Sequence, residues 1–118
     1  MEKFVSKLDV LLEVFPFAII LDTSLRIRSQ GSSLQKITGD LVGENLLNHF
    51  QIQRPYIEKC DFKAIIALQH TAFYIKYIES ELLFRGQFRL SPDQTAMVFL
   101  CSLWVMDIEQ LKPYKLTI

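Results

Sequence analysis

The sequence has few of the residues that build metal centres and disulfide frameworks. Its 118 residues include two cysteines and two histidines. Cys60 and Cys101 form no CxxC pair, and neither His49 nor His70 stands at metal-ligand spacing to a cysteine. We therefore expect no metal site, no disulfide and no bound cofactor.

Charge of one sign and long apolar runs are also missing. Thirteen basic residues balance thirteen acidic ones, so the formal net charge is zero and offers no attraction for nucleic acid or an anionic membrane. No apolar run approaches the ~20 residues of a membrane-spanning helix. Asp9 and Glu13 interrupt the only segment that resembles a signal peptide. We expect a cytoplasmic protein without nucleic-acid or membrane partners.

Catalytic signatures are the third absence. The sequence contains no nucleophile–base pairing, no glycine-rich phosphate loop and no paired-carboxylate motif. Asp22 is the acid of most interest, but its position directly after an apolar run suits a turn better than catalysis. We expect a domain that is not an enzyme, with no catalytic residues.

Apolar residues are what the sequence has in quantity. They make up 50% of the chain, which suits one globular domain with a full core. Two unbroken apolar runs, residues 17–21 and 97–101, predict strands that are buried on both faces. Other parts of the protein must therefore cover both faces of the sheet.

The remaining pattern predicts an α+β domain, in which a five-stranded antiparallel sheet has short helices on one face. Apolar residues recur with period two or in short runs in five segments: 17–22, 25–29, 72–78, 82–90 and 95–102. Short helical pieces are expected between the second and third strands, at 34–37, 44–50 and 62–70. Asp61 is a good cap for the last of these, and residues 51–57, around Arg54-Pro55, are expected to break the helical pattern.

A further helix is expected over residues 1–15, where apolar residues step by three or four until Pro16 ends the helix. Such a short helix is marginal alone, so it must dock. It can pack on the free face of its own sheet or pair with a second copy, and both can hold at once. The candidate dimer interface is Phe4, Leu8, Leu11, Leu12, Phe15, Phe17 and Leu83.

Several short motifs, in this order, carry a resemblance to a known family. They are Phe15-Pro16-Phe17, Arg54-Pro55, Arg85-Gly86-Gln87 and Phe99-Leu100-Cys101-Ser102. Over about residues 15–116 the chain resembles the PAS-like domain of the haem–nitric oxide binding associated family (HNOBA or H-NOXA). One departure is that the family commonly continues the last motif with proline, whereas Leu103-Trp104 follows here. The loop after the last strand is therefore expected to differ in shape from that of the family.

The resemblance implies a signalling and dimerisation module. Related domains in soluble guanylate cyclase and in bacterial signalling proteins relay a signal from a haem–nitric oxide sensor to an output domain. On this basis residues 1–15 are the dimerisation helix, 16–112 the PAS-like domain and 113–118 a tail towards an output domain. The implied partners are a second copy or a paralogous domain, a haem–nitric oxide binding domain, and a histidine kinase or nucleotide cyclase domain.

An alternative function is a small-molecule sensor with a pocket between the sheet and the helices. Its candidate lining residues are Phe62, Ile66, Phe84, Phe88 and Phe99. Nine phenylalanines can equally fill an ordinary core, and we favour that interpretation.

Overall fold

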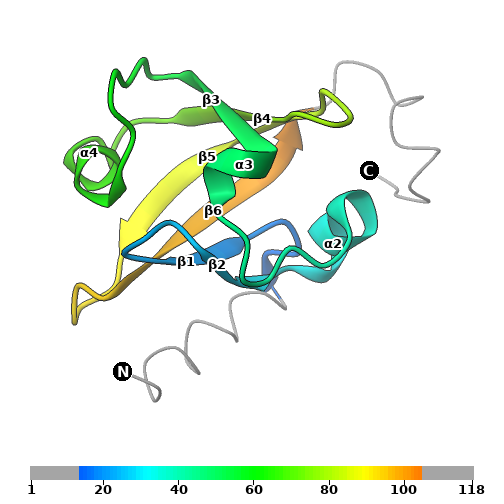
Figure 1. The fold of residues 1–118 in the computed structure, drawn as a ribbon, viewed down its shortest axis with the longest axis horizontal. Helices are drawn as coiled ribbons and strands as arrows, with labels where there is room; N and C mark the ends of the chain where they lie inside the picture. Colours follow the sequence, from blue (N-terminus) through cyan, green and yellow to red (C-terminus); the bar gives the residue numbers. More distant parts are fainter. Residues whose placement is uncertain (1–13, 105–118) are drawn as a thin grey trace.

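A six-stranded antiparallel sheet with short helices makes up the computed structural model, which describes residues 14–104 (Figure 1). In chain order the elements are β1 (Ile19–Asp22), β2 (Ile27–Gln30), α2 (Ser32–Thr38), α3 (Leu46–His49), β3 (Phe50–Arg54), α4 (Phe62–Ala67), β4 (Phe73–Tyr77), β5 (Leu83–Leu90) and β6 (Ala96–Trp104). The α+β class predicted from the sequence is therefore confirmed.

In the sheet, strands from the two ends of the described chain lie side by side. Its strand order is β2-β1-β6-β5-β4-β3, so the first hairpin lies beside the last strand. Ile19 is opposite Phe99 across β1 and β6, and β5 pairs with β6 from Leu83↔Trp104 to Leu90↔Met97. Strands β4, β5 and β6 form a meander, as their alternating pattern and short turns predicted.

The predicted number of strands was wrong, because β3 is a sixth strand at one edge of the sheet. It pairs antiparallel with β4, with Phe50 opposite Tyr77. The sequence pattern indicated a helix over 44–50 and an irregular break after it. The Phe50 N–H instead bonds to the Leu46 carbonyl and closes α3. From Phe50 on, the side chains alternate between the two faces, as in any strand.

The last strand is longer than predicted, because β6 continues through Leu103 and Trp104. These two residues lie opposite Phe84 and Leu83 of β5. The loop expected directly after Ser102 is therefore wrong, because the β5–β6 pairing continues to Leu83↔Trp104.

Local sequence determines where the helices α2 and α4 begin. The Asp61 side chain accepts a hydrogen bond from the Ala64 N–H at 2.8 Å, so the predicted cap of α4 is confirmed. Gly31 is the N-cap of α2, and no side chain caps this helix. A Cβ on Gly31 would lie 2.1 Å from the Pro16 carbonyl oxygen, so only glycine fits there.

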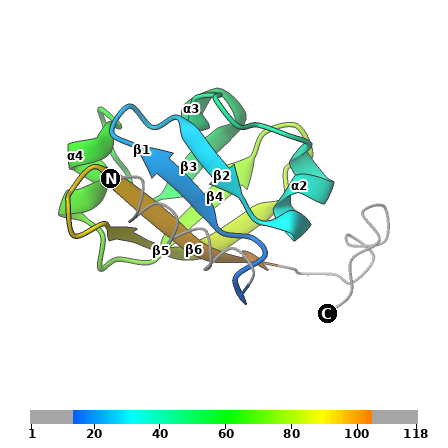
Figure 2. The same ribbon diagram turned by 90° about the horizontal axis from the view of Figure 1, so that it is seen from below.

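The main core lies between the sheet and the helices α2, α3 and α4, which Figure 2 shows on one side of β5 and β6. Phenylalanine rings fill its centre: Phe88 stacks on Phe99 with ring centroids 4.4 Å apart, and Phe73 meets Phe88 edge-on at 4.8 Å. These offset and edge-on arrangements add to the apolar burial. We call this side of the sheet the inner face.

The opposite, outer face also carries a buried apolar cluster. Ala18, Ile20, Ala96 and Val98 are 0–3% exposed, and Leu100 packs against them. We call these five residues the outer-face cluster. Burial of β1 and β6 on both faces is therefore confirmed. The helix predicted over residues 1–15 would cover this cluster, and residues 1–13 of it lie outside the described part of the chain.

None of the helices among residues 14–104 combines the length and apolar character that a bilayer-spanning helix requires.

Candidate functional site

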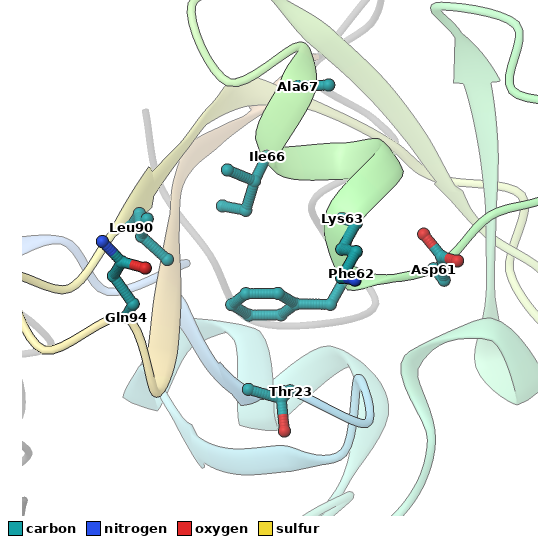
Figure 3. Close-up of a pocket in the computed structure, with 8 residues that line it drawn as sticks. All are labelled: Thr23, Asp61, Phe62, Lys63, Ile66, Ala67, Leu90 and Gln94. Carbon is teal, nitrogen blue, oxygen red and sulfur yellow. The ribbon is translucent and has the colours of Figure 1, made fainter.

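One hollow on the described surface lies beside α4. It has a volume of about 700 Å³ and is lined by Thr23, Asp61, Phe62, Lys63, Ile66, Ala67, Leu90 and Gln94. Figure 3 shows the Phe62 ring reaching into it, between Ile66 on one side and Thr23 on the other. We call it the α4 pocket.

Element ends and turns converge to form the α4 pocket. Phe62 is the first residue of α4, which the Asp61 side chain caps. Leu90 is the last residue of β5, and Gln94 lies in the following turn with a φ of 63°. Thr23 belongs to the turn between β1 and β2. The walls therefore come from three parts of the chain that are far apart in sequence.

The pocket has an apolar wall and a polar rim. Phe62, Ile66 and Leu90 supply the wall, and Lys63 and Gln94 add an ammonium and an amide. Small-molecule sites commonly have this composition. No group of three or more potential metal-ligating side chains occurs within residues 14–104.

Only part of the pocket predicted from the sequence lines this hollow. Phe62 and Ile66 do so, whereas Phe84, Phe88 and Phe99 are at most 1% exposed and lie in the main core. Those three rings pack on aromatic and aliphatic neighbours, so they support the sheet behind the pocket. The turn residues of the lining carry no apolar pattern that sequence reasoning could detect.

A second cluster of interest lies on the outer face, at the end of β6. The Arg85 Nε donates a hydrogen bond to the Tyr74 hydroxyl at 3.0 Å, and the guanidinium carbon lies 5.7 Å from the Tyr74 ring centroid and 5.5 Å from that of Trp104. The two rings meet edge-on at 6.0 Å. We call these three residues the Trp104 cluster. Cation–π contacts hold it together, yet Trp104 is still 43% exposed.

The residues predicted for the dimer interface lie in different places. Leu83 is half-buried on the outer face, directly opposite Trp104. Phe15 is 38% exposed. The Phe17 ring packs against Phe84 of the main core at 5.9 Å. The other four, Phe4, Leu8, Leu11 and Leu12, are outside the described residues.

Neither cysteine is prepared to act as a nucleophile. Burial, and secondarily the Asp61 carboxylate, raises the pKa of the Cys60 thiol. Burial also raises the pKa of Cys101, whose Sγ donates a hydrogen bond to the Phe17 carbonyl oxygen at 2.9 Å. The thiolate is the reactive form, so burial makes both thiols less nucleophilic than an exposed cysteine.

Comparison with known proteins adds a family to this geometry. The sequence model described as "Heme NO binding associated" matches residues 5–82, more than half of the chain. The chain is also similar to soluble guanylate cyclase gcy-31 of Caenorhabditis elegans, with 32% identity over 57 residues. That match covers 48% of this chain and 8% of the relative, so the chain spans less than a tenth of the relative's length.

Proposed function

The chain belongs to the Heme NO binding associated family, and we propose that it is a non-catalytic PAS-like module that relays a signal from a haem–nitric oxide sensor to an output domain. The similarity to a guanylate cyclase supports a cyclase as one output. A histidine kinase is the other output that we consider.

The strand arrangement supports the PAS-like part of the proposal. A first hairpin, a helical middle and a closing meander follow one another, and the hairpin docks beside the last strand. In the region that the structure describes, β3 is one strand more than the five expected. It lies at the sheet edge and leaves the order of the others unchanged.

The outer-face cluster is the single observation that carries the dimerisation part. Helices α2, α3 and α4 cover the inner face, so apolar cover on the outer face must come from another source. We propose that residues 1–15 form a helix that lies over this cluster and pairs with a second copy. Leu83 and the Trp104 cluster extend the same face.

The position of β6 supports the relay part of the proposal. This strand contributes Val98 to the outer face and Phe99 to the main core, and Trp104 is its last residue. A shift at the dimer interface therefore moves the strand from which the chain continues towards residues 105–118. Packed cores respond to such shifts as a unit.

The test is a pair of charge-matched variants, examined by sedimentation equilibrium. Leu8→Asp with Leu11→Asp removes two apolar contacts of about 1.5–3 kcal/mol each, so the dimer should weaken at least 100-fold. Ser6→Asp with Lys7→Gln changes the net charge equally on the polar side and should leave it intact. An intact dimer in the first variant would refute the proposal.

Ligand sensing is a second candidate function, favoured by the α4 pocket, whose wall includes the predicted residues Phe62 and Ile66. Native mass spectrometry of the purified chain should then show a retained small molecule. Ile66→Trp, which fills the hollow, should lose that molecule, whereas Lys36→Ala on α2 should keep it. An unmodified mass in the unaltered chain, even after incubation with cell extract, would exclude this candidate.

A further inference from the structure

The two edges of the sheet differ in how their backbone groups are used. At the β2 edge, the Ile27 N–H donates to the Glu44 carbonyl and the Gly43 N–H donates to the Ile27 carbonyl, both at 2.8 Å. Segment 43–46 thus occupies the edge of β2 at Ile27. At the β3 edge, residues 51–54 make no backbone hydrogen bond to any described residue other than those of β4.

The register with β4 identifies which backbone groups of β3 are open. The Ile78 N–H donates to the His49 carbonyl at 3.0 Å, and the next pair, Phe50 and Tyr77, is directly opposite. Bonded and non-bonded pairs alternate in an antiparallel ladder. Gln51 therefore directs its backbone groups to β4, and Ile52 directs both its N–H and its C=O outwards.

We propose that the β3 edge pairs antiparallel with the β3 edge of a second copy, with Ile52 on the two-fold axis. In this register each Ile52 N–H donates to the other copy's Ile52 carbonyl, as in a bonded pair. The interface is then isologous and closes at two copies. Unpaired edges are the usual template for such strand addition.

The side chains of β3 are complementary to themselves in this register. Gln51 faces Gln53 of the other copy, so no like charges meet. The bulge between Ile52 and Arg54 limits the regular pairing to these central residues. The two glutamine amides of one strand are already 3.2 Å apart, so their counterparts can extend this amide row across the axis. Of the features that protect sheet edges from strand addition, β3 has a bulge between Ile52 and Arg54 and the charge of Arg54, but residues 50–54 include no lysine or proline.

Exposed apolar side chains flank the same edge. A groove beside β3 is lined by Leu47, Phe50, Gln51, Ile52, Gln53, Tyr56, Ile57, Cys60 and Ile78. Tyr56 is 86% exposed and Ile78 49%. Pairing of two β3 edges brings these side chains against the second copy, so apolar burial adds to the backbone bonds.

This edge contact is independent of the outer-face dimer proposed above. It uses the side of the sheet and leaves the outer-face cluster untouched. When both contacts form, the assembly is larger than a dimer. Loss of the helix contact alone leaves the edge contact measurable, so the two proposals fail separately.

Cysteine trapping in the full 118-residue chain tests the register. In a Cys60→Ser background, Gln51→Cys and Gln53→Cys are made as two separate variants. Gln51 and Gln53 of opposite copies form a non-bonded pair with Cα atoms ~4.5 Å apart, which is within disulfide range. Identical positions are offset by two residues, about 6.8 Å along the strands, and cannot be bridged easily.

We expect a covalent dimer on non-reducing gels only when the two variants are mixed before mild oxidation. The yield should persist when Leu8→Asp and Leu11→Asp are added. Failure of the mixture to cross-link, as when a different protein normally occupies this edge, overturns the proposal. So does a single variant that cross-links with itself as readily as the mixture.

Discussion

Gly86 stands where β5 and β6 approach too closely for any side chain. A Cβ at this position would lie 2.1 Å from the Leu100 carbonyl oxygen and 2.6 Å from the Cys101 Cα. Both are backbone atoms of the paired strand, so neither can move aside like a flexible side chain. The glycine is thus required by the strand pairing itself.

Gly86→Ala should therefore destabilise the fold by about 1–3 kcal/mol, as for other overpacked core positions. Urea unfolding followed by circular dichroism measures this. Ser102→Ala, at an exposed site on the neighbouring strand, is the control and should change stability by less than about 0.5 kcal/mol. Equal midpoints for the two variants would contradict the close approach.

Asp93 organises the turn between β5 and β6. Its Oδ1 accepts hydrogen bonds from the Ser91 hydroxyl at 2.7 Å, the Thr95 hydroxyl at 2.7 Å and the Thr95 N–H at 3.1 Å. These bonds favour the charged form, and they lower the pKa of Asp93 from 3.8 to about 2. The charged carboxylate is thus preferred in the folded state.

A lowered pKa makes the stabilisation by Asp93 dependent on pH. It is fully present above pH ~4 and is lost as the pH falls towards 2, because protons then bind the unfolded chain more readily. Asp93→Asn should lower the melting temperature at pH 7, and the gap to the unaltered chain should narrow between pH 4 and 2. A gap that does not change with pH would contradict this.

At the scale of elements, the strands with clear alternation could be predicted from the sequence, and β3 could not. The strands β4 and β5 alternate over five and eight residues. β3 follows a four-residue helix without an intervening turn. Neither the helical period of 3.6 residues nor the strand period of two therefore extends long enough to be recognised. The N-cap Asp61 was predictable because capping depends only on neighbouring residues.

The end of β6 provides the test at this scale. Trp104 is the only tryptophan in the chain, so its fluorescence reports on the Trp104 cluster. Ser102 and Arg85 form a bonded pair of the ladder, so Ser102→Pro should remove an N–H directed to β5 and unpair the end of β6. Trp104 should then become more exposed, and its emission should shift to the red.

Ser102→Thr is the matched control, because it keeps the N–H and a β-branched residue suits a strand. Its emission should stay close to that of the unaltered chain. An unchanged emission in Ser102→Pro would mean that strand pairing does not hold Trp104 in place.

At the scale of the whole molecule, burial on both faces of the central strands was predictable from two apolar runs, and the α4 pocket was not. The runs are local in sequence, whereas the pocket needs the relative positions of two turns, one strand end and one helix. The Trp104 cluster likewise depends on the register that places Tyr74 opposite Arg85. Sequence periodicity indicates which face of a strand each side chain lies on. It does not indicate how neighbouring strands are aligned with each other.

Two neighbouring isoleucines on β1 allow the contributions of the two sheet faces to stability to be compared directly. Ile19 packs in the main core and Ile20 in the outer-face cluster, at 2% and 0% exposure. Replacement of either isoleucine by alanine should lower the free energy of unfolding by about 2–5 kcal/mol. Denaturant unfolding at several protein concentrations measures both. If Ile20→Ala costs less than about 0.5 kcal/mol, the outer face is open to water in solution.

The difference between the two sheet edges also bears on the solubility of the protein. Strand addition becomes fibril growth only when each added chain presents a new open edge. Here a second copy added at β3 would present its own β2 edge, where segment 43–46 already bonds to Ile27. Edge-to-edge addition therefore ends after one step, so the open β3 edge does not lead to amyloid-like polymerisation.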